Sequence, residues 1–262
     1  MRVSVLMGIY NCARTLPEAL DSLLNQTYQD FKIILCEDGS TDNTFEVAKT
    51  YADCHANIVL VRNERNRGLN YTLNRCLELA DTEYCARMDG DDLSLPTRFE
   101  KEVEFLDNHP EYAIVTTPML YFDEGGVFRR GTGGKEPKLT DFPKFSPFCH
   151  APCMIRTDAY KAVGGYTVAD NLLREEDYHL WIKMYQKGYR GYTLSEPLYM
   201  MRDDRDAAKR RSFKARKNEA YVKHLACKML NLPVYYHIYC LKPLILGLLP
   251  DGIYRLLHKL KK

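Results

Sequence analysis

The chain has 262 residues, of which 45% are hydrophobic and 27% are charged. This composition indicates a soluble globular protein and excludes a disordered or fibrous one, and the length allows one large core or one catalytic domain with an appendage. The formal net charge of +2 hides an uneven distribution, because residues 1–206 carry a net charge of −9 and residues 207–262 a net charge of +11. We therefore expect an acidic body and a basic tail that contact different partners.

The cysteines and the N-terminus indicate a reducing, cytosolic setting. Nine cysteines are scattered without the spacing of a disulfide framework, and an apolar strand pattern begins at Val3 with no leader-like segment before it. The stretch CHAPC, at 149–153, has side chains that bind zinc. A second ligand pair at zinc-finger spacing is missing, so a zinc site is not expected.

The first ninety residues alternate between strand and helix patterns. Thr15 is the expected N-cap of the first helix, with Glu18 as its capping-box partner. Apolar runs predict four strands, at 3–9, 31–36, 57–61 and 84–88, and amphipathic segments between them predict three helices. Such repeats form right-handed crossovers and a parallel sheet, so the expected fold class is α/β.

Polar segments directly follow three of these strands. They read GIYN at 8–11, CEDGS at 36–40 and MDGDD at 88–92. Ligands of open parallel sheets bind beyond the carboxyl ends of the strands. The sequence therefore predicts that these segments converge on one small-molecule site.

The pattern after Pro96 is less regular. We expect a strand at 113–122 and a loop bordering the site at 125–147, together with helices at 97–112, 157–166 and 174–189. No internal repeat is visible.

The loop with Asp89, Asp91 and Asp92 has three interpretations. It is either a solvated acidic turn, a calcium loop, or a site for a divalent cation and a diphosphate. An EF-hand counted from Asp89 would require glycine where Ser94 stands, which disfavours calcium. We favour Mg²⁺ or Mn²⁺ held by one or two carboxylates, with Gly90 allowing the bend that points Asp89 and Asp91 at different groups.

Two further carboxylates are candidates, and each has a purely structural alternative. Asp38 either caps a turn or accepts an N–H from a nucleobase. Asp177 either complements a helix dipole or acts as a general base, because it shares the inward face of its helix with Leu180 and Trp181, where desolvation raises a carboxyl pKa. Trp181 is better explained as a core residue than as a platform for a sugar.

Four motifs, taken in order and spacing, resemble the GT-A-fold glycosyltransferases of family 2. They are VSVLMGIYN, EDGSTDNT, the stretch from NRGLNYTLNR to MDGDDLSLPTRF, and GGY followed by EEDYHLW, and together they cover about residues 1–205. The resemblance implies a Rossmann-like, mostly parallel sheet flanked by helices. It also implies inverting transfer of a sugar from a nucleoside diphosphate with Mn²⁺ or Mg²⁺.

The resemblance also implies roles for individual residues. On the donor side it implies that Asp89 contacts the ribose and that Asp91 binds the metal, with Asp89 beside it and Asp92 in support. Asp177 would deprotonate the acceptor hydroxyl. The other residues expected to contact the donor are Gly8, Tyr10, Asn11, Asp38 and Arg67, and those expected on the acceptor side are His150, Glu176 and Trp181.

The sequence departs from the family pattern at two places. Glu37 stands where the turn after the second strand usually has aspartate, although Asp38 is kept. The QxxRW-type signature of processive members is missing, and LYMMRDDRDAAKR stands near its place, so this chain alone is not expected to make long homopolymers.

Two rival functions are less well supported. A sugar-phosphate nucleotidyltransferase would need a glycine- and lysine-rich loop after the first strand, where GIYNCARTL has one glycine and Arg14. A nucleotide-sugar-binding scaffold without catalysis would not need the complete set Asp89, Asp91 and Asp177.

The segment 206–262 is expected to be a helical, basic and amphipathic tail after a catalytic domain at 1–205. That domain would have a nucleotide-sugar half at about 1–95 and an acceptor half at about 96–205. DGIYRLLHKLKK, at 251–262, has one apolar and one basic face, which is typical of an anchor on anionic lipid. The alternative is a helical flap packed on the catalytic domain, with 244–249 buried.

The expected partners follow from these assignments. They are a nucleoside-diphosphate sugar (a UDP-sugar is favoured), a saccharide or lipid-linked acceptor, and an anionic membrane surface contacted by 207–262. A homo-oligomer is compatible with the sequence, and nucleic acid is not expected, because no binding module accompanies the basic tail. We expect a peripheral protein on the inner face of the cell membrane that works in surface polysaccharide synthesis.

Overall fold

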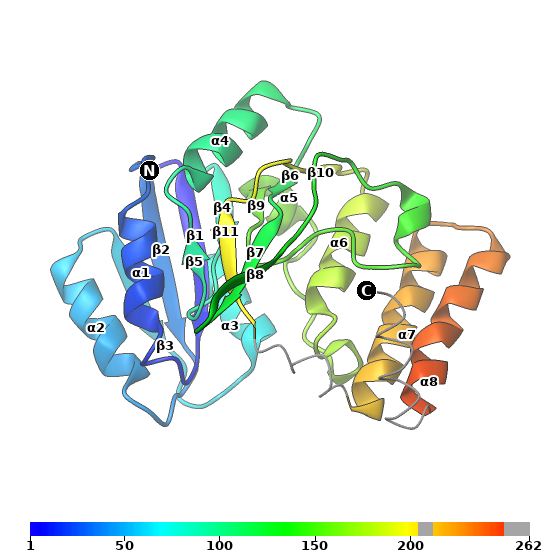
Figure 1. Cartoon of the computed structure of the whole chain (residues 1–262), viewed down its shortest axis with the longest axis horizontal. Coiled ribbons are helices and arrows are strands. Elements are labelled where there is room, and N and C mark those ends of the chain that lie inside the picture. Colours follow the sequence, from blue (N-terminus) through cyan, green and yellow to red (C-terminus); the bar gives the residue numbers. More distant parts are fainter. Residues whose placement is uncertain (204–211, 249–262) are drawn as a thin grey trace.

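A computed structural model describes residues 1–203 and 212–248 of the chain. Its centre is a seven-stranded sheet with the strand order β10-β6-β9-β4-β1-β2-β3 (Figure 1). Neighbouring strands run parallel except at β9, which is antiparallel to both β4 and β6. The strands are β1 (Val3–Ile9), β2 (Phe31–Glu37), β3 (Ile58–Arg62), β4 (Tyr84–Arg87), β6 (Ile114–Thr116), β9 (Met154–Arg156) and β10 (Gly191–Thr193).

Helices cover both faces of this sheet. One face of β1, with Val3, Val5 and Met7, packs in a core with residues of α1 (Leu16–Leu24), α2 (Thr44–Cys54) and α4 (Arg98–Asn108). The opposite face, with Leu6 and Ile34, packs with residues of α3 (Leu69–Glu78), α5 (Thr157–Ala162) and α6 (Glu176–Gln186). Strands β1, β2 and β4 are buried on both faces, which explains their nearly continuous apolar sequences.

The predicted capping box at the start of α1 is wrong. Thr15 is the N-cap, but its side chain caps no helix N–H. Its hydroxyl instead donates to the carbonyl of Gly90 at 3.0 Å, and Glu18 forms an ion pair with Arg202 at 2.7 Å. Both residues therefore connect α1 to the acidic loop and to a distant strand.

A second sheet was only partly predicted. Its strand order is β5-β11-β7-β8, with β5 (Leu93–Ser94), β7 (Met119–Asp123), β8 (Gly126–Arg130) and β11 (Tyr199–Arg202). The expected single strand at 113–122 is two strands in two sheets, because Pro118 lacks the N–H that would continue the first ladder. Part of the expected loop at 125–147 is β8, which pairs with β7 after a turn where Gly126 has a φ of 97°.

The C-terminal part of the described chain is helical. It comprises α7 (Phe213–Met229), the 3₁₀ segment η4 (Val234–Cys240) and α8 (Leu241–Leu248), and α7 packs against α6 (Figure 1). Val222, Ala226 and Leu230 of this region belong to the same buried cluster as Trp181. The predicted amphipathic segment at 251–262 lies outside the described residues.

Candidate active site

A cavity of about 400 Å³ lies at the carboxyl edge of the main sheet. The parallel register pairs Ile9 of β1 with Glu37 of β2, so the segments that follow these strands leave the sheet at one edge. Five of the residues expected to contact the donor line this cavity, namely Gly8, Tyr10, Asn11, Asp89 and Asp91.

Asp89 and Asp91 have different environments, although only Gly90 separates them. The Nη2 atom of Arg87, a buried arginine, donates to Oδ1 of Asp89 at 2.5 Å. Asp91 is exposed, and no other side chain in the described ranges forms a hydrogen bond or ion pair with its carboxylate, which is contacted by its own backbone N–H. Asp89 is thus fixed by the protein, and Asp91 is available to a ligand.

Asp92 is a structural member of the acidic loop. It is buried and accepts hydrogen bonds from the Tyr199 hydroxyl at 2.9 Å and from the Arg202 N–H at 2.8 Å. Burial, followed by the charges of Asp89 and Asp91, raises the pKa of Asp92 to about 8. The side chain ties the loop to β11.

Gly90 is required for space. A β-carbon at this position would lie 2.8 Å from Sγ of Cys12 and 3.3 Å from a methyl group of Ile9. The carbonyl of Gly90 also accepts the Thr15 hydroxyl. A side chain here would push the acidic loop away from the end of β1.

The residues at this edge fit a divalent cation that is shared with a ligand. In the part of the chain that the structure describes, no three His, Cys, Asp or Glu side chains form a group that could hold a metal ion. Mg²⁺ is commonly held by only one or two carboxylates, with phosphate and water oxygens completing its shell. The unpaired carboxylate of Asp91, beside Asp89, meets that requirement.

The segments after β1 and β2 hold each other in place. Asn11 has a left-handed backbone with a φ of 49°, its N–H donates to Oγ of Ser40 at 3.0 Å, and its Oδ1 accepts the Thr41 N–H at 2.9 Å. Tyr10 is exposed beside it, 45% accessible. Asn11 therefore shapes the edge that presents Tyr10.

Asp38 is buried, does not line this cavity and is hydrogen-bonded within the chain. Its carboxylate accepts hydrogen bonds from Asn63 Nδ2 at 2.6 Å and from the N–H groups of Arg67 and Gly68 at 2.9 and 2.8 Å. Arg67 stacks over Tyr71 with 4.3 Å to the ring centre and lines a separate cavity of about 520 Å³. Asp38 thus positions the loop before α3, and the predicted donor set borders two cavities.

Asp177 lies in the first turn of α6, next to Glu176. Burial, followed by the charge of Glu176, raises the pKa of Asp177 to about 7. The nearby Arg87 guanidinium opposes this rise. A carboxyl group with such a pKa is suited to accept a proton near neutral pH.

His150 and Trp181, both expected on the acceptor side, lie side by side. Nε2 of His150 contacts the Tyr166 hydroxyl at 2.5 Å, and burial lowers the pKa of His150 well below its ordinary value, so the ring is neutral. Trp181 is fully buried, with its ring 5.5 Å from Phe148 and 6.1 Å from His150. Stacking on a sugar requires an exposed ring face, so Trp181 supports His150 from within the core.

Three residues that sequence reasoning missed connect the site. Arg87 binds Asp89 and also influences the pKa of Asp177. Arg202 lines the cavity and donates from Nε to the carbonyl of Asp91 at 3.0 Å. The Tyr199 hydroxyl also accepts the N–H of Asp89 at 3.2 Å. The sequence did carry a signal for Arg87, because a charged residue is unusual in an otherwise apolar strand. Nothing in the sequence around Tyr199 marks it as a site residue.

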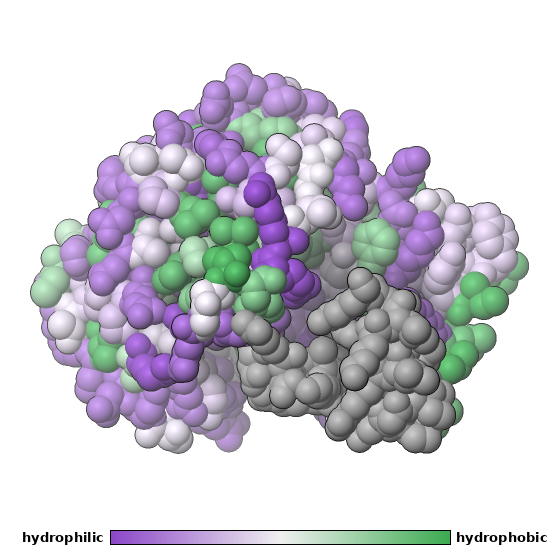
Figure 2. Space-filling model, in the orientation of Figure 1, coloured by the Kyte–Doolittle hydropathy of each residue, from purple (hydrophilic) through white to green (hydrophobic). Residues whose placement is uncertain are grey.

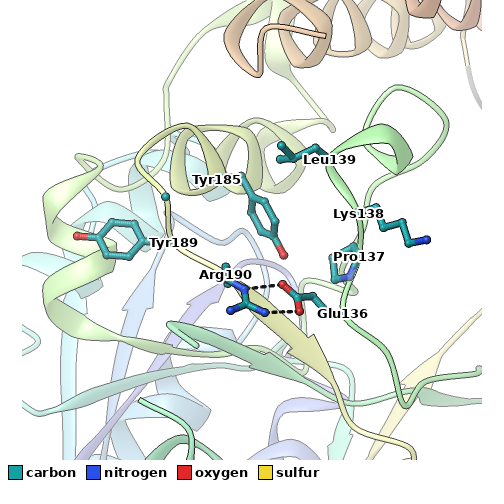
Figure 3. Close-up of a pocket in the computed structure, with 8 residues that line it drawn as sticks. Glu136, Pro137, Lys138, Leu139, Tyr185, Tyr189 and Arg190 are labelled. Carbon is teal, nitrogen blue, oxygen red and sulfur yellow. Dashed lines mark hydrogen bonds and ion pairs between the residues drawn. The ribbon is translucent and has the colours of Figure 1, made fainter. Parts of the chain in front are cut away.

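A further cavity of about 460 Å³ lies on the side of α6 that carries Tyr185 (Figure 3). Tyr185 and Leu139 lie over an ion pair in which Arg190 donates from Nε and Nη2 to Glu136 at 2.7 and 2.6 Å. The Tyr185 hydroxyl accepts the Gly191 N–H at 3.1 Å. These polar groups already bind one another, in contrast to Asp91.

Residues 4–164 match the model of the family described as glycosyl transferase family 2. The chain belongs to this family. It is therefore a glycosyltransferase, as the four motifs predicted.

Three relatives illustrate the family membership. The chain is 44% identical to EpsE of Bacillus subtilis (strain 168), over 98% of this chain and 93% of EpsE. It is 31% identical to the amylovoran biosynthesis glycosyltransferase AmsE of Erwinia amylovora, over 85% of this chain and 84% of AmsE. It is 26% identical to the UDP-Glc:α-D-GlcNAc-diphosphoundecaprenol β-1,3-glucosyltransferase WfaP of Escherichia coli, over 71% of each chain.

Solved structures confirm the predicted GT-A fold. The crystal structure of residues 1–349 of TarS from S. aureus in complex with UDP-GlcNAc matches with a TM-score of 0.72 at 20% identity, over 95% of this chain and 72% of that chain. The mannosyltransferase PcManGT from Pyrobaculum calidifontis, in complex with GDP-Man and Mn²⁺, matches with a TM-score of 0.65 at 18% identity, over 98% of this chain and 79% of that chain.

Proposed function

We propose that this glycosyltransferase moves a sugar from a nucleoside-diphosphate sugar to a hydroxyl group of a saccharide acceptor, with inversion at the anomeric carbon. The observation that carries the proposal is that two carboxylates have different environments, each suited to a different task. Asp91 faces the cavity unpaired, and Asp177 has a pKa of about 7. Arg87 connects the two regions, because it binds Asp89 and acts on Asp177.

The donor half of the proposal concerns the cavity at the ends of β1 and β4. Tyr10 would contact the base directly, whereas Asp38, which is bound within the chain, would contribute to base recognition by holding the loop that carries Arg67. Asp89 would bind the ribose. Asp91, with Asp89 beside it, would hold Mn²⁺ or Mg²⁺, which orients the diphosphate and offsets its charge. Binding of UDP-GlcNAc by TarS and of GDP-Man with Mn²⁺ by PcManGT supports a metal-bound nucleotide sugar, and we favour a UDP-sugar.

The acceptor half of the proposal assigns the proton transfer to Asp177. Its carboxylate takes the proton of the acceptor hydroxyl while that oxygen bonds to the anomeric carbon from the face opposite the diphosphate. The bond from the anomeric carbon to the diphosphate oxygen breaks, and the nucleoside diphosphate leaves with those electrons. Glu176 and His150 would border the acceptor.

The acceptor is proposed to be lipid-linked and to belong to surface polysaccharide synthesis. The names of AmsE, which refers to amylovoran biosynthesis, and of WfaP, which refers to a diphosphoundecaprenol acceptor, support this. An apolar face on η4 and α8 supports location at a membrane (Figure 2, over α8 at the right-hand edge). Its exposed residues are Val234, Tyr235, Ile238, Leu241, Ile245 and Leu248, and we call them the C-terminal apolar face.

The composition of the C-terminal region favours an anionic lipid surface as the partner of this face. Residues 220–248 contain Lys223, Lys228 and Lys242 and no Asp or Glu. Tyrosines of η4 are amphipathic side chains that suit a membrane interface. No helix within the described ranges is both long and apolar enough to cross a membrane. We propose a catalytic domain at 1–205 and a region at 206–262 in which α7 packs on that domain and the remainder associates with the inner face of the cell membrane.

Two substitutions test the assignment of Asp91 and Asp177. Asp91→Asn removes the charge that holds the cation, so we expect Mn²⁺-dependent UDP binding to weaken by about tenfold or more. Asp177→Asn should leave this binding intact and lower transfer by about 10²- to 10⁴-fold, the usual contribution of a general base. Calorimetry with UDP and Mn²⁺, and transfer from a panel of UDP-sugars, measure the two effects.

Three results would contradict the proposal, and the first is unchanged Mn²⁺-dependent UDP binding in Asp91→Asn. Near-normal transfer by Asp177→Asn means that another group takes the proton. A wild-type chain that binds UDP-sugars with Mn²⁺ but neither transfers nor hydrolyses them is the inert scaffold instead. Asp42→Asn is a matched control, because Asp42 borders the same cavity but its carboxylate is bound to Thr44 and to the N–H of Ala13.

A further inference from the structure

Two polar side chains of α7 are buried and point into the catalytic part of the molecule. Asn218 is 6% exposed and Lys223 is 2% exposed. Burying an amide or an ammonium group away from water is costly unless its hydrogen bonds are replaced. Both side chains replace them with backbone carbonyls from other segments, and these segments are the ones that carry the acceptor-side residues.

Asn218 binds the turn that leads into α6. Its Nδ2 donates to the carbonyl of Asp170 at 3.1 Å and to the carbonyl of Leu173 at 3.1 Å. The first of these residues begins the 3₁₀ turn η2 (Asp170–Leu172), and the second follows it directly. Leu173 is only four residues before Asp177.

The backbone between Leu173 and Asp177 has little freedom. Arg174 has a left-handed φ of 71°, which non-glycine residues seldom adopt and which persists only where neighbouring structure imposes it. The N–H of Glu175 then donates to the carbonyl of Leu172 at 2.9 Å, and α6 begins at Glu176. A displacement at Leu173 would therefore be passed to the first turn of α6.

Lys223 binds the other acceptor-side segment in the same way. Its Nζ donates to the carbonyl of Pro143 at 3.0 Å and to that of Lys144 at 2.7 Å. This segment continues to Phe148, which packs edge-on against Trp181 with ring centres 5.5 Å apart. One helix thus fixes the segments on both sides of the acceptor region.

We propose that α7 is part of the catalytic apparatus and that Asn218 is a positioning residue for Asp177, with Lys223 assisting through the segment before His150. The inference rests on the proposed role of Asp177 as the base. Asn218 touches neither donor nor acceptor. It holds the turn that leads into α6, the helix from which the base projects. A shift of about 1 Å in such a group can cost about 10²-fold in rate.

The experiment compares two substitutions in α7 of the full-length chain. Asn218→Leu keeps the size of the side chain and removes both donated hydrogen bonds. Val222→Ala is the matched control, because Val222 is buried on the same helix and contributes packing alone. We measure thermal unfolding, UDP affinity with Mn²⁺, and kcat and KM for transfer, together with amide hydrogen exchange over 170–178.

We expect Asn218→Leu to lower kcat by about tenfold or more while UDP affinity stays within about twofold of wild type. Hydrogen exchange over 170–178 should accelerate in this variant and not in Val222→Ala. Lys223→Met, compared with Lys228→Met at an exposed position of the same helix, should show a smaller loss of the same kind.

Two results would overturn the inference. One is an unchanged kcat in Asn218→Leu, and the other is an equal loss in Asn218→Leu and Val222→Ala, which would make the effect one of stability alone. Hydrogen exchange separates this inference from the proposed function, since it requires no substrate. If the wild type transfers no sugar, the proposed function fails, and unchanged exchange in Asn218→Leu would show that Asn218 does not fix the Asp177 segment.

Discussion

Asp177 provides a pH-dependent prediction at the scale of a single residue. Its pKa is raised to about 7 by burial and then by Glu176, and the base must be ionised to accept a proton. The value of kcat at saturating donor should therefore rise with pH and level off above about pH 7, falling about tenfold per pH unit well below it. Steady-state kinetics between pH 5 and 9, at roughly unit intervals, measure this limb.

The charges near Asp177 predict the direction in which the acid limb of the pH–rate profile should shift when one of them is removed. Glu176 and Arg87 are the charged groups with the largest effects on its pKa, and the charge of Asp177 in turn raises the pKa values of Cys149 and Tyr166. Glu176→Gln removes a negative charge, so the acid limb should move to lower pH. An acid limb that stays in place in this variant, or one near pH 4 in the wild type, would show that Asp177 is not the titrating base.

Single residues also show what the sequence could and could not predict. Gly90 was singled out as a bend, and the structure adds that a β-carbon at this position would collide with Cys12. Thr15 and Glu18 fitted a capping box, but their side chains bind Gly90 and Arg202 instead. The residue types marked these positions as structurally important. The contacts of each side chain depend on packing between distant segments, which the local sequence does not show.

At the scale of an element, α4 carries a fully buried ion pair that contacts the residues holding the acidic loop. Nε of Arg98 lies 3.1 Å from Oε2 of Glu102, one turn away, and both side chains are fully buried. The Arg98 Nη2 donates to the carbonyl of Arg87 at 3.0 Å, and the guanidinium lies 5.1 Å from the ring centre of Tyr199. Arg98 thus contacts two residues that hold Asp89.

Removal of one partner of this pair should be strongly destabilising. Arg98→Met leaves the Glu102 carboxylate buried without a counter-charge, so we expect the free energy of unfolding to fall by about 3–5 kcal/mol. The double variant Arg98→Met/Glu102→Leu removes both charges and should recover a large part of the loss. Urea unfolding of the wild type, Arg98→Met, Glu102→Leu and the double variant forms a double-mutant cycle, and additive losses would contradict a coupled pair.

The same pair has a defined pH dependence. Burial raises the pKa of Glu102 to about 7, above the value of about 4.3 for an unfolded chain. The folded state therefore binds this proton more tightly than the unfolded state. Loss of the Arg98 charge raises the folded pKa further, so the stability of Arg98→Met should decline as pH rises from about 4.3 through and beyond 7.

Elements were predictable where local pattern and tertiary position agree. Strands β1, β2 and β4 are mostly apolar and buried, and segments that follow β1 and β4 line the cavity, which is why the cavity edge could be predicted from the sequence. Strand β9 has three residues and enters the sheet between β4 and β6 from far along the chain. Such a short strand has no periodicity to read, and its antiparallel pairing depends on non-local contacts.

At the scale of the whole molecule, the uneven charge distribution corresponds to two different surfaces. The acidic loop borders the cavity at the carboxyl edge of the main sheet, and the basic C-terminal region carries the C-terminal apolar face. The alternative interpretation was a helical flap with residues 244–249 buried. In α8, however, Ile245 is 57% exposed and Leu248 is 74% exposed. Helix α7 is buried against α6 at the same time, so a deletion of 207–262 would remove core as well as surface.

Point substitutions in the full chain therefore test membrane binding better than a deletion. Ile238→Glu/Ile245→Glu places two carboxylates on the C-terminal apolar face, and both positions are exposed, so the fold should be kept. Burial of each isoleucine is worth about 1.5 kcal/mol or more, which predicts a loss of over about a hundredfold in partitioning onto anionic vesicles. Flotation with vesicles of mixed phosphatidylserine and phosphatidylcholine measures it.

The control is Val127→Glu, at an exposed apolar position of β8 outside the face. This variant should float like the wild type, and wild-type flotation should weaken with added salt and with purely phosphatidylcholine vesicles, because the lysines of the region contribute through charge. Transfer to a water-soluble saccharide should be unchanged in Ile238→Glu/Ile245→Glu, since neither residue borders the donor cavity. Equal flotation of this variant and the wild type would remove the C-terminal apolar face as the membrane contact.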